Sequence, residues 1–239
     1  MKLLDLTLES PFANVALDEA LLDSAEQSAD SDDVLRLWEP ASPFVVIGRS
    51  SIVAQEVQLD FCKHNSIPIV RRASGGAAIV TGPGCLMYAL VLSIARWPEL
   101  EMLDTAHRMI LQRNASALQK IGIDAQMQGT SDLAIGDRKF SGNSMRRKRD
   151  WILYHGTLLY GLSGSLIQQC LNHAPRQPEY RQARTHSDFV ATISASASDL
   201  KHALLNAWAA SDSLQAWPAD LTQRLFAERY RLDSWNLAR

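Results

Sequence analysis

One lysine, Lys139, lies between two glycines in the segment that offers the most chemistry in this chain. The segment reads Gly-Asp-Arg-Lys-Phe-Ser-Gly-Asn-Ser-Met-Arg-Arg over residues 136–147. Its first two residues, Gly136 and Asp137, are typical of a hairpin turn, so we expect Lys139 just inside the returning strand. A strand holds a side chain more rigidly than a loop does, so an ammonium group there can be directed at a phosphate. The segment predicts a local anion site, in which Gly142 would let another backbone come close.

A second segment, residues 70–80, reads Val-Arg-Arg-Ala-Ser-Gly-Gly-Ala-Ala-Ile-Val. Two arginines leave a β-type run, and a Ser-Gly-Gly turn follows them. Arginine offers a planar fork of donors suited to phosphate or carboxylate, and the N–H groups of a glycine turn add fixed partial positive charge. Taken alone, each segment keeps a plainer interpretation open. Residues 70–80 would be a tight hairpin with a structural arginine, and residues 136–147 a surface hairpin with a solvated basic cluster at Arg146–Arg149.

Composition indicates an ordinary soluble protein in a reducing compartment. The chain has 239 residues, of which 46% are hydrophobic and 21% charged, and a formal net charge of -2. That charge gives no global attraction to nucleic acid or to an anionic membrane, so any anion site must be local. The three cysteines are far apart, and the sequence has neither a secretory leader nor an apolar run long enough to span a bilayer. We therefore expect a cytoplasmic protein with no nucleic-acid or membrane partner.

The elements expected to position these segments mix strands and helices without the regular alternation of a doubly wound sheet. Strands are expected over residues 2–8, 34–38, 42–48, 67–70, 87–94 and 151–160. Helices are expected over 14–22, with Asn14 as N-cap, and over 56–64, 105–121, 198–209 and 219–229. This mixture predicts a single α+β domain around a mixed sheet.

Four short motifs, in order along the chain, resemble those of the lipoate-protein ligase A family. They are Arg71–Ala78, Ser131–Leu133, Asp137–Ser144 and His155–Leu159. The resemblance covers most of the chain and becomes thin after about Pro175. It implies the fold of class II aminoacyl-tRNA synthetases and biotin synthetases, a mixed sheet with flanking helices. It also implies one catalytic domain over residues 1–239, with its core at about 30–215 and no C-terminal accessory domain.

The same resemblance implies a reaction in two steps. ATP, with Mg²⁺, activates the carboxylate of lipoate or octanoate to an acyl-AMP. The acyl group then passes to a specific lysine of its protein acceptor, either a lipoyl domain of a 2-oxoacid dehydrogenase E2 subunit or the glycine cleavage H protein. A separate accessory chain is a further partner that the resemblance allows.

Residue roles follow from the matching motifs. Lys139 would neutralise charge on the phosphate and on the acyl carboxylate, and Asp132 would place Mg²⁺ or order the site. His155 is either a proton acceptor for the attacking lysine or a structural hydrogen-bonding group. The groups expected to hold nucleotide and acyl chain are Arg72, Ser74, Gly75, Gly76, Ala77, Ala78, Ile79, Val80, Asp132, Ser141, Gly142, His155 and Gly156.

The chain departs from the family pattern just after the glycine turn. Ala77 stands where the third glycine is usual, Thr81-Gly82 replaces His-Asp, and Cys85 replaces asparagine. These changes keep two other functions open. One is an ATP-independent octanoyl or lipoyl transferase that holds a thioester on a cysteine, for which Cys85 is the candidate. The other is a non-catalytic relative that binds an acyl group or a nucleotide.

Overall fold

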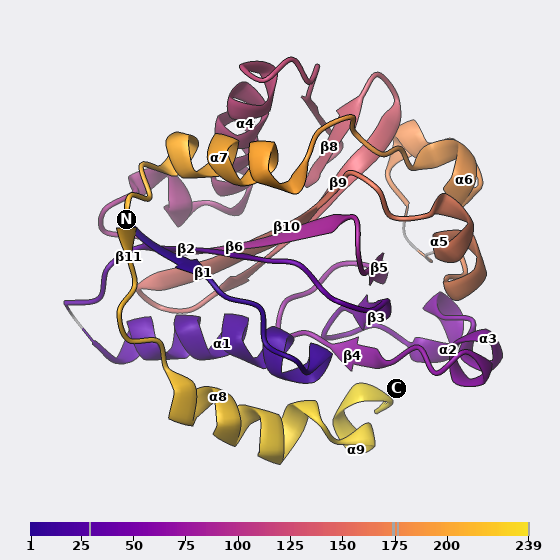
Figure 1. Cartoon of the computed structure of the whole chain (residues 1–239), viewed down its shortest axis with the longest axis horizontal. Helices are drawn as coiled ribbons and strands as arrows, with labels where there is room; N and C mark the ends of the chain where they lie inside the picture. Colours follow the sequence, from indigo (N-terminus) through magenta and orange to yellow (C-terminus); the bar gives the residue numbers. More distant parts are fainter. Residues whose placement is uncertain (29, 174, 176, 239) are drawn as a thin grey trace.

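A mixed β-sheet forms the centre of the molecule. The computed structural model describes residues 1–28, 30–173, 175 and 177–238. Within these residues, eight strands form the sheet in the order β11-β1-β2-β6-β10-β9-β8-β7 (Figure 1). β1 runs parallel to both of its neighbours, and the other pairs are antiparallel. The strands are β1 (Lys2–Asp5), β2 (Val34–Trp38), β6 (Cys85–Ser93), β7 (Gln126–Gln128), β8 (Asp132–Ile135), β9 (Arg138–Arg147), β10 (Trp151–Leu159) and β11 (Asp212–Ser213).

A smaller sheet lies beside the large one and carries the arginine-rich segment. Its order is β4-β3-β5, formed by β3 (Phe44–Ile47), β4 (Ile69–Arg71) and β5 (Ile79–Thr81). The turn between β4 and β5 contains the Ser-Gly-Gly sequence. Nearby lie the short helices α2 (Val53–Glu56) and α3 (Leu59–His64), while α5 (Gly164–Cys170) and α6 (His186–Phe189) pack against each other (Figure 1).

Longer helices cover both faces of the large sheet. α4 (Leu103–Gln119) and α7 (Ala197–Trp208) lie together on one face, and α1 (Pro11–Gln27) lies on the other (Figure 1). Outside α1 packs α8 (Ala219–Leu225), and α9 (Asp233–Asn236) follows near the C-terminus. Among the described residues, no helix combines the length and the apolar character that a membrane crossing requires.

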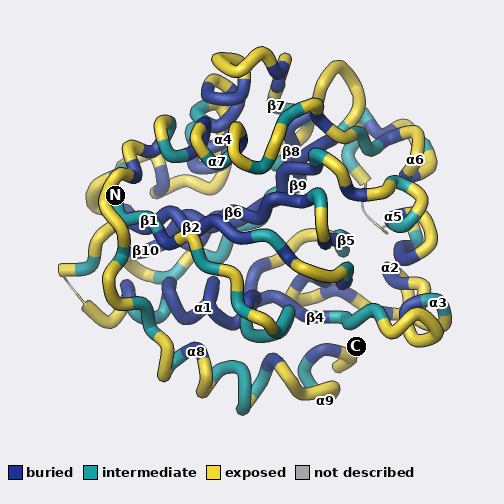
Figure 2. The backbone as a smooth tube through the Cα atoms, viewed as in Figure 1, coloured by how far each residue is buried: buried dark blue, intermediate teal, exposed yellow. Residues whose placement is uncertain are grey.

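Alternating side chains on β6 explain how one strand serves both layers. Tyr88, Leu90 and Leu92 belong to the core under α4 and α7, whereas Ala89 and Val91 belong to the core under α1. Successive side chains of a strand point to opposite faces, so a strand covered on both sides reads as a nearly continuous apolar run. Figure 2 shows the central strands as the most deeply buried part of the molecule.

The structure confirms the predicted α+β class and most elements, and corrects three local predictions. α1 begins earlier than expected and its N-cap is Ser10, because Asn14 lies inside the helix and bonds the Leu8 backbone through its side chain. The helix expected over 56–64 is two short helices, because Val57 leaves the helical path to pair with Leu171. The helix expected over 219–229 ends at residue 225 and continues as a π-helical turn over 226–230.

Candidate active site

The β8–β9 hairpin forms as predicted and presents Lys139 through a bulge. A two-residue turn, Gly136-Asp137, joins the strands, and the pairing register shifts by one residue beyond it: Leu133 pairs with Ser141, but Ala134 pairs with Lys139. Phe140 is the additional residue, and its ring is fully buried in the core. A bulge changes which face the following side chains occupy. It therefore brings Lys139 to the same side of the hairpin as Gly142, three positions further on.

Lys139 forms an ion pair with Asp132 in this arrangement. Its Nζ lies 2.8 Å from Asp132 Oδ1, and Tyr180 donates a hydrogen bond of 2.7 Å to Asp132 Oδ2. Burial, together with the Asp132 charge, raises the pKa of the Tyr180 hydroxyl above its usual value, so Tyr180 remains a donor. Both carboxylate oxygens of Asp132 are thus occupied, and the carboxylate fixes the direction of the ammonium group.

Gly142 makes room for the lysine side chain and not, as predicted, for another backbone. A Cβ atom at residue 142 would lie 2.9 Å from both Cε and Nζ of Lys139. Any larger residue would push the ammonium group away from Asp132. The glycine was correctly identified as a close-approach position, but the approaching group comes from its own strand.

Arg72 lies beneath the Ser-Gly-Gly turn and holds it in shape. Its guanidinium is buried and donates to backbone carbonyls of the turn, to Gly75 O (3.0 Å from Nε) and to Ala77 O (3.1 Å from Nη2). Burial lowers the pKa of Arg72 to about 10, against an opposing effect of the Glu56 carboxylate. Gly76 adopts φ +86°, and a Cβ there would lie 2.8 Å from Arg72 Nη2, so both backbone and space require glycine.

Glu56 and Ser144 tie the turn to its surroundings from two sides. Glu56 is buried and accepts a hydrogen bond of 2.7 Å from the Ala78 N–H, and Ser144 of β9 donates to Gly75 O at 2.8 Å. The turn therefore lies between α2 and the lysine-bearing strand. Its N–H and C=O groups are held in fixed directions at the edge of the cavity described below.

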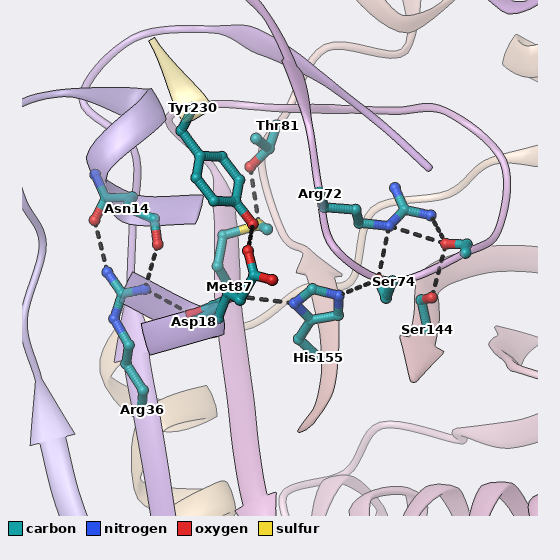
Figure 3. A network of polar contacts seen from close by, with 12 residues as sticks. Asn14, Asp18, Arg36, Arg72, Ser74, Thr81, Met87, Ser144, His155 and Tyr230 are labelled. Atoms are coloured by element: carbon teal, nitrogen blue, oxygen red, sulfur yellow. Dashed lines mark hydrogen bonds and ion pairs between the residues drawn. The ribbon is translucent and has the colours of Figure 1, made fainter. Parts of the chain in front are cut away.

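A buried chain of polar side chains connects α1, β10 and the turn (Figure 3). Arg36 Nη1 lies 2.6 Å from Asp18 Oδ1, and His155 Nδ1 lies 3.0 Å from Asp18 Oδ2. On its other side, His155 Nε2 lies 2.6 Å from Ser74 Oγ, which also accepts from Arg72 Nε at 3.1 Å. His155 thus spans the gap between α1 and the turn.

Charge fixes the direction of these hydrogen bonds. Burial raises the pKa of Asp18, but Arg36 and His155 together outweigh burial, so the net pKa lies below its usual value. An ionised carboxylate can only accept, so the Nδ1 of His155 donates to Asp18. With Nδ1 as the donor of a neutral ring, Nε2 accepts a hydrogen bond from the Ser74 hydroxyl. His155 is therefore held by two partners and orders the turn.

A cavity of about 430 Å³ opens between these elements. Polar groups from the turn, the hairpin and the buried chain line it together with apolar residues from α1 and both sheets. They are Val15, Asp18, Trp38, Val46, Arg72, Gly76, Ala77, Ala78, Ile79, Met87, Thr130, Ser131, Asp132, Lys139, Gly142, Asn143, Ser144, His155, Gly156, Thr157, Gln177 and Pro178. Lys139 and the turn therefore border one space, although Lys139 lies 63 positions after Gly76 in sequence.

A second, smaller cavity of about 110 Å³ adjoins the first. The two share Ala77, Ala78, Ile79, Lys139, Gly142, Thr157 and Pro178. Its remaining lining comes from β5, β10, α2, α5 and α6 and the segment before α6, and includes Glu56, Val80, Arg181 and His186. We call this space the side chamber. Lys139 lies where the main cavity and the side chamber meet.

Gly156 is required by the packing of the cavity wall. A Cβ at this position would lie 1.8 Å from Asn143 Oδ1, so only glycine leaves room for the asparagine. Asn143 in turn accepts from the Tyr88 hydroxyl and donates to Ser131 O at 2.8 Å. This network fixes the strand pair β9–β10 beside Lys139.

Most of the predicted site residues line one or both cavities in the structure, and three do not. Lining one or both cavities are Arg72, Gly76, Ala77, Ala78, Ile79, Val80, Asp132, Lys139, Gly142, His155 and Gly156. Ser74, Gly75 and Ser141 line neither; Ser74 and Ser141 are buried and support the lining from behind. Ser141 accepts from the side-chain amide of Asn143 at 3.1 Å.

Cys85 does not reach either cavity. It is fully buried at the start of β6 and packs in the apolar cluster around the small sheet. Burial raises the pKa of its thiol to about 12. Cys170 is also buried, and burial raises its thiol pKa to about 12 as well. Neither thiol has the exposure or the low pKa that a nucleophilic cysteine needs.

Sequence reasoning missed several polar residues of the site, among them Asp18, Glu56, Tyr180 and Arg181. Asp18 offered a signal, because it lies four positions after Asn14 and so on the same face of a helix whose neighbouring positions are largely apolar. Glu56 fell inside a predicted helix. Tyr180 and Arg181 lie where the family resemblance is thin, and no spacing in the sequence connects them to Lys139.

The donor set does not form a protein-only metal centre. Across the described residues, no three His, Cys, Asp or Glu side chains are grouped so that they could hold a metal ion. Two carboxylates line the main cavity, Asp132 and Asp18. Asp132 lies beside Lys139, whereas the oxygens of Asp18 bind Arg36 and His155. Mg²⁺ commonly binds through one or two carboxylates and the phosphates of a substrate, so a nucleotide would have to supply the other oxygens.

Comparison with known proteins identifies the family. The model of the lipoyl protein ligase A/B catalytic domain matches residues 10–208, and the chain belongs to this family. The probable lipoate-protein ligase A of Mycoplasma pneumoniae is 29% identical over 162 residues, which are 68% of this chain and 46% of that protein. The chain spans about half the length of this relative and of three further lipoate-protein ligase A relatives.

Solved structures show the same fold. One is the bipartite lipoate protein ligase of Thermoplasma acidophilum, studied with its E2 lipoyl domain, at a TM-score of 0.84 and 22% identity, covering 99% of this chain and 95% of that one. Another is a lipoate-protein ligase A bound with ATP, at a TM-score of 0.83 and 22% identity, covering 99% and 98%. At this identity the likeness establishes the fold.

Proposed function

We propose that this chain is a lipoate-protein ligase-like acyltransferase. Its reaction would activate lipoate or octanoate with ATP to an acyl-AMP and transfer the acyl group to a lysine of an acceptor protein. The observation that carries the proposal is Lys139, held by Asp132 at the meeting point of the main cavity and the side chamber. Family membership and the ATP-bound relative support the same reaction.

In the first step, a carboxylate oxygen of the acyl substrate attacks the α-phosphorus of ATP. A mixed anhydride forms, the bond to the outer phosphates breaks, and pyrophosphate leaves. Both reactants are anions, so a cation is needed to bring them together and to stabilise the charge of the transition state. Lys139 would supply this charge, with Asp132 and Tyr180 holding it in place.

The walls of the main cavity suggest where each substrate part would lie. Val15, Trp38 and Met87 form an apolar portion that suits an acyl chain. The nucleotide would lie along the Ala77–Val80 backbone, which borders both cavities. Since the two regions meet beside Lys139, the acyl carboxylate and the α-phosphate would approach each other there.

Arg72 and His155 act in this proposal as groups that position the turn. The donors of Arg72 are directed at carbonyls of its own turn, and His155 is bonded to Asp18 and Ser74. A proton-accepting role for His155 in the second step would require it to release Ser74. We therefore assign it a positioning role. The amine of the acceptor lysine is protonated at neutral pH, since its reference pKa is about 10.4. It must lose a proton before it attacks, and in this proposal another group than His155 takes that proton.

An acyl transferase with a cysteine thioester is the alternative within the same family. The buried positions and raised thiol pKa of Cys85 and Cys170 argue against it. A non-catalytic relative is a second alternative. The ion pair of Lys139 with Asp132, facing the main cavity, argues for catalysis.

The proposal has further parts, which concern the metal ion, the acceptor, the partners and the location. Mg²⁺ would enter with the phosphates of ATP, and Asp132 would be the protein carboxylate that holds it. Acceptors would be lipoyl domains of E2 subunits, as in the Thermoplasma system, or a glycine cleavage H protein. A separate accessory chain, a cytoplasmic location and a single catalytic domain over residues 1–239 complete the proposal.

Lipoate-dependent exchange of labelled pyrophosphate into ATP tests the first step without an acceptor. The purified chain should catalyse the exchange with Mg·ATP, and Lys139→Ala should reduce it by about a hundredfold or more. Lys201→Ala, which removes an exposed lysine paired with Asp5, is the matched control and should leave the exchange unchanged. Absence of exchange in the wild type, with octanoate tested as well, would contradict the proposed activation.

A further inference from the structure

Arg71, at the end of β4, connects α9 to the loop that follows β3. The residue is buried, with 1% of its surface exposed. In the loop, its Nη1 donates to Gly48 O at 3.0 Å and to Ser51 O at 2.8 Å. In α9, its Nε donates to Trp235 O at 3.0 Å and its Nη2 to Asn236 O at 3.2 Å. The donors of a guanidinium lie in one rigid plane, so this side chain fixes the two segments relative to each other.

α9 also bonds the backbone of β4 at Arg71. The Oδ1 of Asn236 accepts from the Arg71 N–H at 2.9 Å, and the indole N–H of Trp235 donates to Arg71 O at 2.9 Å. Asn236 is 1% exposed, and its amide nitrogen donates to Tyr230 O at 2.7 Å. An apolar residue at position 236 would leave the Arg71 N–H and the Tyr230 carbonyl without these bonds in a buried place. Hydrogen bonding, and not only volume, therefore specifies Asn236.

The loop over residues 48–51 lies directly against the glycine turn. The Arg49 N–H donates to Ser74 O at 2.8 Å, just as the Arg72 N–H donates to Ile47 O at 3.0 Å. A Cβ at residue 48 would lie 2.0 Å from Gly76 O, so a glycine there permits the close approach of the two backbones. The position of the turn thus depends on the loop, whose carbonyl groups bind the guanidinium described above.

The segment that carries α9 is anchored on α1. Tyr230 is fully buried and donates to Glu19 Oε2 at 2.6 Å, and Arg229 Nη1 lies 2.8 Å from the same oxygen. Glu19 follows Asp18, which reaches the turn through His155 (Figure 3). Two adjacent residues of α1 therefore start two routes to the turn, one through His155 and one through α9.

We propose that Trp235 and Asn236 are positioning residues for the reaction: through Arg71, they hold the 48–51 loop and the glycine turn in place for the nucleotide. This inference rests on the proposed function, in which the nucleotide lies along the Ala77–Val80 backbone. Neither α9 residue lines a cavity, so both act through the hydrogen bonds described above. The apolar part of the main cavity comes from α1, β2 and β6, so a displaced turn should weaken nucleotide binding and spare the acyl chain.

Hydrogen exchange of the full chain, followed by peptide mass spectrometry, tests the connection without a substrate. Asn236→Ala should speed the hydrogen exchange of peptides covering residues 47–51 and 72–78 by about threefold to tenfold, because the hydrogen bond to the Arg71 N–H is lost. Asn206→Ala removes an exposed asparagine of α7 and is the matched control, which should exchange as the wild type does. Equal hydrogen exchange of these peptides in the two variants would overturn the inference.

Kinetics of pyrophosphate exchange test the consequence for the substrates. Asn236→Ala should raise KM for ATP by about tenfold and leave kcat and KM for lipoate within about threefold. A loss of stability alone would lower the amount of folded protein, and thus kcat, without raising one KM. Trp235→Phe keeps an aromatic ring but loses the bond to Arg71 O, and should raise KM for ATP by about threefold. Equal rises in both KM values, or a fall in kcat alone, would contradict the inference.

The two measurements separate this inference from the proposed function. If the wild type catalyses no pyrophosphate exchange, the proposed function fails, and the hydrogen-exchange comparison alone decides whether α9 positions the turn. Faster hydrogen exchange in Asn236→Ala than in Asn206→Ala would then still support the connection. If Asn236→Ala does not fold, as judged by circular dichroism, Trp235→Phe takes its place in both measurements.

Discussion

Removing Asp18 should cost far more stability than removing an exposed acid. Asp18 is 5% exposed at its side chain, Arg36 is fully buried, and their nearest atoms are 2.6 Å apart. Asp18→Ala leaves the Arg36 charge buried without its counterion, which costs about 3–5 kcal/mol of unfolding free energy. At about 2–4 °C for each kcal/mol in a domain of this size, the midpoint of thermal unfolding should fall by about 6–20 °C.

Two further variants make the test specific. Asp5→Ala removes an acid from an exposed pair with Lys201 and should cost about 0–1 kcal/mol. Replacing both buried partners, Asp18→Ala with Arg36→Met, should recover much of the loss, because no unpaired charge remains. Urea unfolding followed by circular dichroism measures all four proteins. The reasoning is refuted if Asp18→Ala loses no more than Asp5→Ala, or if the double variant is less stable than Asp18→Ala.

The same pair predicts an acid limit to stability. The pKa of Asp18 lies below its usual value in the folded protein, since Arg36 and His155 outweigh the opposing effect of burial. A group with a depressed folded pKa contributes stability that is fully present above its unfolded pKa, about 3.9, and is lost as the pH falls through the lower folded value. Between about pH 5 and the folded pKa, Asp18→Ala should therefore show a smaller pH dependence of unfolding free energy than the wild type.

Three more predictions concern the site. Gly156→Ala should abolish substrate activation while the fold persists, because the added Cβ would lie 1.8 Å from Asn143 Oδ1. Exchange assays measure the activation and circular dichroism measures the fold. Full activity of this variant would contradict the packing argument. Cys85 should resist thiol reagents at pH 8 in the native protein and react after denaturation, because the residue is buried and burial raises its thiol pKa to about 12. Peptide mass spectrometry locates the labelled cysteine. Rapid labelling of Cys85 in the native protein would refute its burial. Asp132→Asn should reduce kcat of exchange by about a hundredfold with little change in KM for ATP, because Lys139 loses its anionic partner. An unchanged kcat would show that Asp132 has no role in the reaction.

Local pattern was sufficient to predict the longer strands and the hairpin, because their signals are local, but it did not predict the short strands β5, β7 and β11. The short extended run followed by a Gly-Asp turn identified β8, β9 and the position of Lys139 within the returning strand. What the pattern could not give was the bulge at Phe140. A single additional residue leaves no distinct signal in sequence, yet it decides that Lys139 and Gly142 share one face.

Contacts between distant segments account for the remaining differences. Asn14 has the composition of a helix cap, but the buried Arg36, 22 positions away, makes it an internal hydrogen-bonding residue. Arg181 and Tyr180 join the site because their segment folds back on the lysine hairpin, which no periodicity predicts. The family motifs identified Lys139 and the glycine turn as partners, and the structure brings them to one cavity.

Transfer of the acyl group to an apo lipoyl domain is the most direct test of the central claim. The purified chain is incubated with lipoate, Mg·ATP and the acceptor, and the acceptor mass is followed by mass spectrometry, with octanoate and an acyl carrier protein thioester as alternative donors. The proposed mechanism predicts a lipoyl adduct that requires ATP, is lost in Lys139→Ala and is retained in Cys85→Ala and in Lys201→Ala. Transfer that proceeds from the thioester without ATP and is lost in Cys85→Ala would contradict it.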